Sequence, residues 1–324
     1  MRRWMAAVLV LAAASGLIAP TASAQGPARK PVTILVGFPP GQATDLVARL
    51  IAEPLRTALD RPVLIENKPG QGGSVVLAAL ARAPADGTTL SLSALAAYSV
   101  NPHLYKSVGY DTLKDFEPIA LVAELPLALV VNPKVPAKTV AELIAHAKSN
   151  AGKLNHGSSG YGTLSHLLME DLKRRAGIDI AHVPYQGSPR FMGDLTAGEV
   201  QVGLDTVTVT QPHVRAGALR LLAVGSRDRL PEFPEVPSIA ESGFPGFEGV
   251  AWLGLSGPAG LSAAFVGQAE RALAEALRSS DLVAKLRSLG AAPRPSTSAE
   301  FRAFMAAEYK RWGDVVRESG VKVE

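Results

Sequence analysis

The chain has 324 residues, with no cysteine, 24 prolines and 30 glycines. Lys and Arg total 33 against 29 Asp and Glu, a formal net charge of +4. The lack of cysteine excludes a disulfide scaffold, a zinc–thiolate or iron–sulfur site, a cysteine nucleophile and a lipid-modified N-terminal cysteine. The length predicts about two domains, with enough chain to bury a sizeable core.

Residues 1–24 have the layout of a secretory signal peptide. Arg2 and Arg3 precede an apolar stretch over residues 4–18, and Ala22-Ser23-Ala24 matches a cleavage site. A membrane anchor is the alternative, but this stretch is shorter than the ~20 apolar residues that a span needs. We therefore expect cleavage after Ala24 and export to the periplasm.

The remaining chain shows no strong charge or hydropathy bias. Removal of two arginines with the signal peptide lowers the net charge to +2, so nucleic acid is not expected as a partner. The most apolar later run, 119–131, contains Glu124 and Pro126 and is not expected to span a membrane. Without a cysteine the exported chain carries no lipid anchor, and we expect no membrane insertion.

The first part of the mature chain alternates short apolar runs with amphipathic stretches, which is the pattern of an α/β fold. The expected elements, in chain order, are a strand over 32–36, a helix from about Thr44, a strand over 62–66, a helix over 74–83 and a strand over 88–92. Pro54 should kink or open the first helix. The long run 119–131 is expected to be extended and broken at Pro126.

The second part continues the alternation and ends in helices. Thr139 and Glu142 form a capping box at the start of a helix that reaches about Lys148. The later expected elements are a helix over 163–175, strands over 180–183 and 200–204, a short helix over 207–216, strands over 219–224 and 250–255, and helices over 262–279, 281–289 and 298–318.

This order of elements predicts two α/β lobes. Strands and helices alternate, a proline-containing extended run lies in the middle, and helices cluster at the C-terminal end. We expect the chain to leave the first lobe and return to it. The boundaries follow as lobe 1 over 25–126, lobe 2 over 127–247, and a return to lobe 1 over 248–324.

Two turns share one physical design, a strand followed by a glycine-rich turn and a helix start. They are Phe38-Pro39-Pro40-Gly41-Gln42 and Gly157 through Thr163. A helix N-terminus presents unpaired N–H groups and partial positive charge, and glycine lets the backbone approach a ligand closely. Each turn is therefore a candidate anion site, one in each lobe. The alternative is that both are ordinary strand-to-helix turns.

Known catalytic and nucleotide motifs fit poorly. In the 157–163 turn Thr163 stands where a phosphate-binding loop requires lysine, and the turn lacks the G-x-S-x-G nucleophile elbow. A periplasmic esterase using Ser158 or Ser159, with His156 or His166 as base, is the remaining enzymatic alternative. No spacing of histidines or carboxylates indicates a metal site, and we expect no metal, no cofactor and no catalytic residue.

Two further side chains are candidates for the cleft. His166 stands three residues into the helix after the 157–163 turn, where it can either contact a ligand or simply pack. Asp205 follows the apolar strand 200–204 at its carboxyl end, where ligands bind in open α/β sheets. The alternative for Asp205 is N-capping of the next short helix.

A set of ordered motifs resembles the tripartite tricarboxylate transporter receptors, the Bug family of periplasmic solute-binding proteins. The resemblance covers essentially the whole mature chain. The motifs that carry it lie at 34–49, 66–73, 86–90, 101–102, 110–111, 115–116, 157–163, 182–187, 212–214, 216–217, 245–248, 252 and 257–260.

The resemblance implies a two-lobed periplasmic binding protein fold of type II, with a mostly parallel sheet flanked by helices in each lobe. It implies a small carboxylic acid as ligand, held between the two turns by N–H groups, hydroxyls and bridging waters. Asp205 would face the distal part of the ligand. The expected ligand-binding residues are Phe38, Pro39, Pro40, Gly41, Gln42, Ser158, Ser159, Gly160, Thr163, His166 and Asp205.

Three departures from the family pattern bear on the ligand. Gln42 stands where the family usually has a second glycine, and its side chain either narrows the turn or adds an amide to the site. Pro39 and Pro40 stiffen the turn and remove two N–H donors. Gln186 replaces a usual Lys or Arg beside the cleft.

We expect a monomeric receptor that delivers a small organic carboxylate to membrane transporter subunits. An orphan receptor that presents the ligand to a sensor protein is the alternative that the sequence does not separate from transport.

Overall fold

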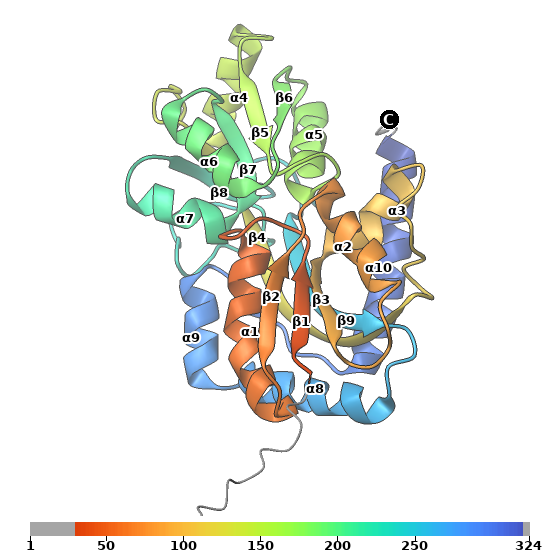
Figure 1. Ribbon diagram of the computed structural model, residues 1–324. Helices are drawn as coiled ribbons and strands as arrows, with labels where there is room; N and C mark the ends of the chain where they lie inside the picture. Colours follow the sequence, from red (N-terminus) through yellow and green to blue (C-terminus); the bar gives the residue numbers. More distant parts are fainter. Residues whose placement is uncertain (1–29, 320–324) are drawn as a thin grey trace, which may run out of the picture.

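The computed structural model describes residues 30–319 as two α/β lobes joined by a long strand, β4 (Phe116–Val131), that runs through both (Figure 1). The strands form one sheet in the order β2-β1-β3-β9-β4-β7-β5-β6, with β10 and β8 also paired to β4. The predicted signal peptide, 1–24, lies outside the described residues.

Lobe 1 contains the N-terminal strands and the C-terminal helices. Its strands are β1 (Val32–Val36), β2 (Val63–Asn67), β3 (Thr89–Ala94), the first part of β4 (Phe116–Val131), β9 (Val250–Pro258) and β10 (Ala292–Pro293). Its helices are α1 (Ala43–Leu59), α2 (Ser74–Leu80), α3 (Asn101–Leu104), α8 (Ala263–Ala276), α9 (Ser280–Ser288) and α10 (Ser298–Ser319), with short helical turns η1 (Gln71–Gly73) and η2 (Ala96–Val100).

Lobe 2 is formed by the middle of the chain and by the end of β4. Its other strands are β5 (Asn155–Ser158), β6 (Ala181–Pro184), β7 (Val202–Thr206) and β8 (Arg220–Val224). Its helices are α4 (Val140–Ser149), α5 (Leu164–Ala176), α6 (Ser188–Ala197) and α7 (Val207–Arg215).

The sheet is mixed, so the expectation of mostly parallel sheets is wrong for the centre of the molecule. The outer strands do pair in parallel, β1 with β2 and β3, and β5 with β6 and β7. Strand β9 is antiparallel to β3 and β4, and β4 is antiparallel to β7 and β8. Strand β4, to which β7, β8, β9 and β10 all pair in antiparallel fashion, runs from lobe 1 into lobe 2.

Strand β4 crosses between the lobes without a break. Pro126 pairs with Val250 of β9, and the next residue, Leu127, pairs with Thr206 of β7. The predicted break at Pro126 is therefore wrong. A proline removes one ladder N–H, and here it stands where the strand exchanges one partner for another.

The return crossing lies beside the same point. Gly225 N donates to Leu127 O at 2.7 Å, Gly249 N donates to Gly225 O at 2.7 Å, and Leu127 N donates to Gly249 O at 2.9 Å. A Cβ at Gly225 would lie 2.6 Å from Gly249 O, so only glycine allows the two chain segments to approach this closely.

The helices follow the predicted pattern with two differences. Helix α1 continues through Pro54 to Leu59 and buries Val47, Ile51 and Leu55 at helical spacing. Helix α6 was not predicted, although its buried Phe191, Met192 and Leu195 lie at helical spacing.

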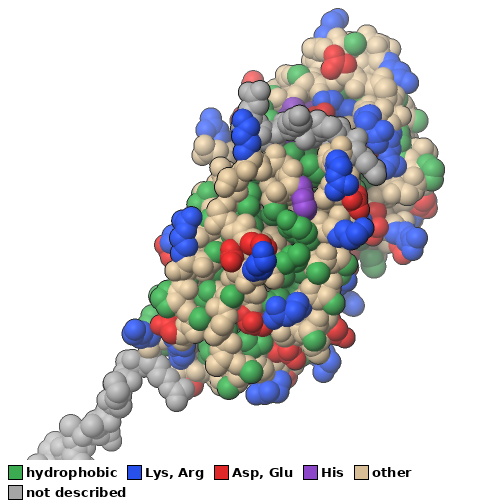
Figure 2. All heavy atoms as spheres, turned by 90° about the vertical axis from the view of Figure 1, so that its right-hand side faces the viewer, with side chains coloured by type: hydrophobic (Ala, Val, Ile, Leu, Met, Phe, Trp, Pro, Cys, Tyr) green, Lys and Arg blue, Asp and Glu red, His purple; other side chains and the backbone are tan. Residues whose placement is uncertain are grey.

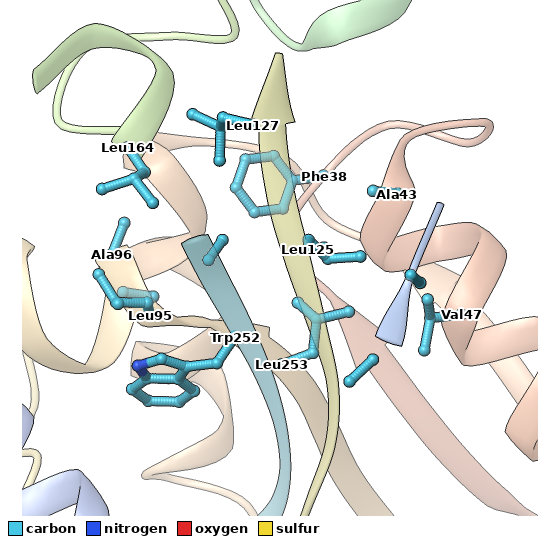
Figure 3. Close-up of a cluster of buried hydrophobic side chains, with 14 of the residues drawn as sticks. Phe38, Ala43, Val47, Leu95, Ala96, Leu125, Leu127, Leu164, Trp252 and Leu253 are labelled. Carbon is cyan, nitrogen blue, oxygen red and sulfur yellow. The ribbon is translucent and has the colours of Figure 1, made fainter. Parts of the chain in front are cut away.

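The hydrophobic core extends beneath the cleft between the lobes (Figure 3). The Phe38 side chain from the β1–α1 turn lies among Leu125 and Leu127 of β4, and Leu164 of α5 approaches from lobe 2. The floor of the cleft is thus apolar and built by both lobes.

Charged side chains of both signs are mixed over the face seen in Figure 2, with no large area of one sign. Among the described residues no helix is both long and apolar enough to span a bilayer.

Candidate functional site

The first predicted turn, Phe38–Gln42, is called the lobe 1 turn here, and it links β1 to α1. Asp45 in the first turn of α1 is 1% exposed, and its Oδ2 accepts a hydrogen bond from Gly41 N at 2.9 Å. Arg49 binds both oxygens of Asp45, at 3.0 and 2.9 Å. Asn67, at the end of β2, donates to Phe38 O at 2.9 Å and to Asp45 Oδ1 at 3.0 Å. Hydrogen bonds from the turn to Asp45 and Asn67 therefore fix its conformation.

The lobe 1 turn uses most of its own donors internally. Gly41 N is taken by Asp45, Gln42 N donates to Pro39 O at 3.3 Å, and Pro39 and Pro40 have no N–H. Phe38 supplies the remaining N–H. Burial alone would raise the pKa of Asp45, but the hydrogen bonds from Arg49, Gly41 and Asn67 outweigh it and lower that pKa. A stable anion at Asp45 keeps the turn in place.

The second predicted turn, Gly157–Thr163, is called the lobe 2 turn here, and it links β5 to α5. Thr163 caps α5, since its Oγ1 accepts from His166 N and donates to Gly160 O at 2.7 Å. Ser158 Oγ lies 2.7 Å from His182 Nε2. The N–H groups of Ser159, Gly160 and Gly162 make longer contacts of 3.3 to 3.4 Å to side chains.

Ser159 differs from its neighbours in the lobe 2 turn. Its hydroxyl makes no hydrogen bond to any of the described residues, and its side chain borders both hollows of the cleft. Ser158 and Thr163, by contrast, use their hydroxyls to hold the turn. Of the predicted hydroxyls, Ser159 is the one placed to meet a ligand.

Two hollows lie between the lobes. The outer one has a volume of about 470 Å³, within the usual range for small-ligand sites. Its lining residues are Gly37, Phe38, Pro39, Pro69, Gly70, Gln71, Gly72, Tyr105, Ser159, Gly160, Tyr161, Pro184, Tyr185, Gln186 and Gly187.

The inner hollow is much smaller, at about 50 Å³. Phe38 and Ser159 border both hollows, so one residue from each turn stands where the two meet. The inner lining consists of Phe38, Gln42, Ala43, Thr44, Ala94, Ala96, Leu125, Leu127, Ser159, Thr163, Leu164, Ser165, Asp205, Thr206 and Ala251.

Asp205 lies at the end of β7 and borders the inner hollow. Its Oδ2 accepts from Ser188 Oγ at 2.7 Å, and its Oδ1 accepts from Thr206 N at 2.6 Å. The side chain is 3% exposed. Burial raises the pKa of Asp205 to about 6, even though hydrogen bonds from Ser188 and Thr206 favour the charged form.

Behind the lobe 2 turn, three imidazoles form a stack. His182 lies between His166 and His156, with ring centroids 4.2 and 4.7 Å away. Burial, reinforced by the neighbouring imidazoles, lowers the pKa of His166 to about 4 and that of His182 to about 3. His166 borders neither hollow. Its Nδ1 accepts from Gly162 N, which agrees with the packing alternative for this residue.

The lobes touch on both sides of the hollows. Gln42 Oε1 accepts from Ser188 N of α6 at 3.1 Å, and Tyr105 OH donates to Tyr161 O at 3.1 Å. A Cβ at Gly187 would lie 2.6 Å from Pro39 Cγ. The Gln42 side chain thus adds an amide to the site and contacts lobe 2, one of the two effects expected of it.

Most predicted residues border a hollow, but some do not. Pro40, Gly41, Ser158 and His166 line neither hollow: Ser158 and His166 are buried behind the lining, whereas Pro40 and Gly41 are exposed to solvent. The prediction missed Pro69–Gly72, Tyr105 and most of the inner lining. It placed Gln186 beside the cleft and Tyr161 within the lobe 2 turn, but counted neither as a ligand-binding residue. The Pro69–Gly72 segment also stands between a strand and a helix start in a glycine-rich turn, so the argument applied to the other two turns would have found it.

The described residues contain no group of three or more His, Asp or Glu side chains that could hold a metal ion. A serine–histidine pair does exist, but it joins Ser158 to His182 and not to the His156 or His166 weighed from the sequence. Ser158 is completely buried, so a substrate carbonyl has no access to its hydroxyl.

The comparisons with known proteins agree with this architecture. Residues 47–321 match the model of the tripartite tricarboxylate transporter family receptor. Protein BugT of Bordetella pertussis (strain Tohama I) is 37% identical over 325 residues, covering 100% of this chain and 99% of BugT.

Solved structures of similar proteins agree as well. Rpa4515 of R. palustris with adipate is 33% identical with a TM-score of 0.87, covering 90% of this chain and 97% of that one. MatC from Rhodopseudomonas palustris with bound malate is 33% identical with a TM-score of 0.83, covering 89% and 99%. The chain therefore belongs to the tripartite tricarboxylate transporter receptor family, whose members are periplasmic solute-binding proteins.

Proposed function

We propose that this chain captures a small organic carboxylate between the lobe 1 turn and the lobe 2 turn. One observation carries the proposal: Phe38 and Ser159, one from each turn, stand together at the junction of the two hollows. The Phe38 N–H and the Ser159 hydroxyl, with bridging waters, are neutral donors suited to a single anionic group.

The relatives support this ligand class. Two similar structures carry adipate and malate, both carboxylates. In this chain the predicted site residues that border the hollows are Phe38, Pro39, Gln42, Ser159, Gly160, Thr163 and Asp205. Pro40, Gly41, Ser158 and His166 act by holding the turns in shape.

We further propose that the lobes, 25–126 with 248–324 and 127–247, close on the ligand about the crossing at Leu127, Gly225 and Gly249. Backbone hydrogen bonds join the three segments there, and a hinge between two lobes lies where few chain segments cross. The receptor is then a monomer whose closed, loaded form is recognised by membrane transporter subunits. The signal peptide 1–24 would direct it to the periplasm, which N-terminal sequencing of the exported protein tests.

Catalysis is not part of the proposal. A nucleophilic serine must reach its substrate, and the one serine with a histidine partner is buried. Presentation of the ligand to a sensor protein is the alternative to transport. Loss of growth on the identified ligand after deletion of the gene supports transport, and unchanged growth with a lost transcriptional response supports sensing.

A thermal-shift screen of acids against their amides tests the ligand class. A true ligand raises the melting temperature by mass action, so we expect shifts with carboxylates and none with the matched amides. Ser159→Ala should weaken the binding of an active acid by roughly tenfold or more. Ser107→Ala, at an exposed position that lines neither hollow, is the control and should bind normally. Equal shifts with acid and amide would contradict the proposal.

A further inference from the structure

The two hollows are lined by almost no ionisable side chains. Apart from tyrosines, Asp205 is the only ionisable side chain among all the residues that line them. No lysine, arginine or histidine borders either space in the described chain. A carboxylate bound at the junction is met by neutral donors, and a second carboxylate on the same ligand would find no cation in either hollow.

The Gln42 side chain, from the lobe 1 turn, contacts the start of helix α6 in lobe 2, where a second anion could otherwise bind. Its Oε1 accepts from Ser188 N, the first residue of α6, and its side chain is 7% exposed. The partial positive charge of that helix start is thus matched by a neutral amide oxygen of lobe 1. Because the Gln42 oxygen holds this N–H, a ligand must displace it to bind there.

Asp205 would repel a second carboxylate in the inner hollow. Ser188 donates its hydroxyl to Asp205, so Gln42, Ser188 and Asp205 form one connected group that bridges the lobes. A carboxylate entering the inner hollow would be buried beside another carboxyl in a space of about 50 Å³. Burial of two like charges without a cation is strongly unfavourable. The inner end is closed to a second acid group by both space and charge.

The outer hollow is instead suited to an uncharged, flat body. It offers about 470 Å³, and three tyrosines and three prolines border it. These residues are Tyr105, Tyr161, Tyr185, Pro39, Pro69 and Pro184. Aromatic faces and edges gain most from packing against another ring, and side chains with few rotatable bonds lose little entropy on binding.

We propose that this receptor selects a monocarboxylic acid with an aromatic or cyclic body. The acid group lies at the junction of the hollows and the ring fills the outer hollow, where a second carboxylate on the ring would meet no cation. The Gln42–Ser188–Asp205 group keeps a second carboxylate out of the inner hollow. This inference rests on the proposed function, since it names the substrate class of the same site.

Two matched pairs of acids test the selectivity by titration calorimetry on the full mature chain. Benzoate is compared with terephthalate, and hexanoate with adipate, so that each pair differs by one carboxylate. We expect the monocarboxylate to bind at least about tenfold more tightly in each pair, a difference of ~1.4 kcal/mol, and benzoate to bind more tightly than hexanoate.

Three variants then locate the cause. In the hexanoate–adipate pair, whose flexible chain can turn a second acid toward the inner hollow, Gln42→Ala frees Ser188 N and should reduce the preference for the monocarboxylate several-fold. Asp205→Asn, which removes the acidic group at nearly constant shape, should do the same. Terephthalate holds its second acid across the ring in the outer hollow, so the ratio of the aromatic pair should stay the same in both variants. Gln42→Glu retains an acceptor for Ser188 N and should retain or strengthen the preference. The readout is a ratio of two affinities in one protein, so a general loss of stability does not mimic it.

The outcomes separate the two proposals. If each dicarboxylate binds as tightly as its partner, or if Gln42→Ala and Asp205→Asn leave the hexanoate–adipate ratio unchanged, the selectivity is wrong while the carboxylate receptor stands. Equal binding of benzamide and benzoate contradicts the receptor proposal itself. Binding of none of the four acids overturns this inference.

Discussion

The lobe 1 turn and the lobe 2 turn have the same design but are held by different chemistry. Ionic contacts of Asp45 with Arg49 and of Asp45 with Gly41 N fix the lobe 1 turn. Hydroxyls and neutral imidazoles fix the lobe 2 turn, through contacts that include several of 3.3 to 3.4 Å. In the lobe 1 turn the N–H groups of Gly41 and Gln42 are paired internally, and that of Phe38 remains. In the lobe 2 turn the hydroxyl of Ser159 has no internal partner among the described residues.

This difference suggests that the two turns have separate tasks. A turn whose N–H groups are already paired provides a rigid wall, and pre-organised contacts reduce the entropy lost on binding. A turn with looser contacts can adjust as the lobes close. The following substitutions should therefore affect the two turns unequally.

The largest effect is expected at the support of the lobe 1 turn. Asp45→Ala leaves Gly41 N and Asn67 without a buried acceptor and removes the partner of the exposed Arg49, which should cost about 2–4 kcal/mol of unfolding free energy. Urea denaturation measures the loss. Glu53→Ala removes an exposed ion pair with Arg56 on the same helix and should leave stability unchanged, because exposed pairs contribute little. Similar curves for both variants would contradict the role of Asp45.

The next effect concerns the imidazole stack behind the lobe 2 turn. Buried neutral histidines bind protons less readily when folded than when unfolded, because burial lowers their pKa values to about 4 and 3 at His166 and His182. Their contribution is complete above pH ~6.5, the unfolded value, and is lost as the pH falls toward those folded values. The melting temperature should accordingly decrease below pH ~6.5.

A variant isolates the histidine contribution from other groups. Asp205 acts in the opposite direction, because burial raises its pKa to about 6 in the folded protein. Folding therefore favours its protonated form. Its contribution to stability grows as the pH falls from about 6 toward the pKa of an aspartate in the unfolded chain. His182→Gln keeps a partner for Ser158 and also keeps Asp205. Its melting temperature should fall less between pH 7 and 4 than that of the wild type. Parallel profiles would show that the stack does not titrate as described.

A smaller effect is expected at the cap of α5. Thr163→Val removes the acceptor for His166 N and the donor to Gly160 O, at a cost of about 1–2 kcal/mol in unfolding free energy. Ligand affinity should fall as well, through the altered shape of the lobe 2 turn. Thr163→Ser restores the hydroxyl and should recover both properties. If Ser fails to rescue, the methyl group and not the hydroxyl is what matters.

The smallest effect is expected at the contact between the lobes. Tyr105→Phe keeps the ring in the outer hollow and removes the hydrogen bond to Tyr161 O. Ligand affinity should fall about two- to tenfold, because the closed form loses one partly exposed hydrogen bond between the lobes. Calorimetric titration measures it. Tyr110→Phe, whose hydroxyl bonds within lobe 1 alone, is the matched control, and an equal loss there would contradict a role in closure.

Much of this architecture follows from local pattern. The turns at Phe38–Gln42 and Gly157–Thr163 were predicted because strand, glycine-rich turn and helix start are contiguous in the sequence. Helix α6 was missed although the sequence signals it: Phe191, Met192 and Leu195 have helical spacing, and Pro189 near its start and Gly198 after its end are usual at helix termini.

Other features depend on contacts between residues far apart in the chain, which local sequence patterns do not predict. His182 faces Ser158 and stacks on His156 only because β5 and β6 pair in the register that sets His156 beside His182. The contact of Gln42 with Ser188 joins residues 146 positions apart and requires both lobes to be placed. Pattern predicts the turns, and the tertiary fold decides which of their donors remain for a ligand.

The most direct test of the account is a crystal structure of the mature protein with the tightest-binding acid found by titration. We predict a carboxylate oxygen within about 3 Å of Ser159 Oγ, and contact with Phe38 N directly or through one water. A carboxylate bound away from both turns, or held by a lysine or arginine elsewhere on the molecule, would contradict it.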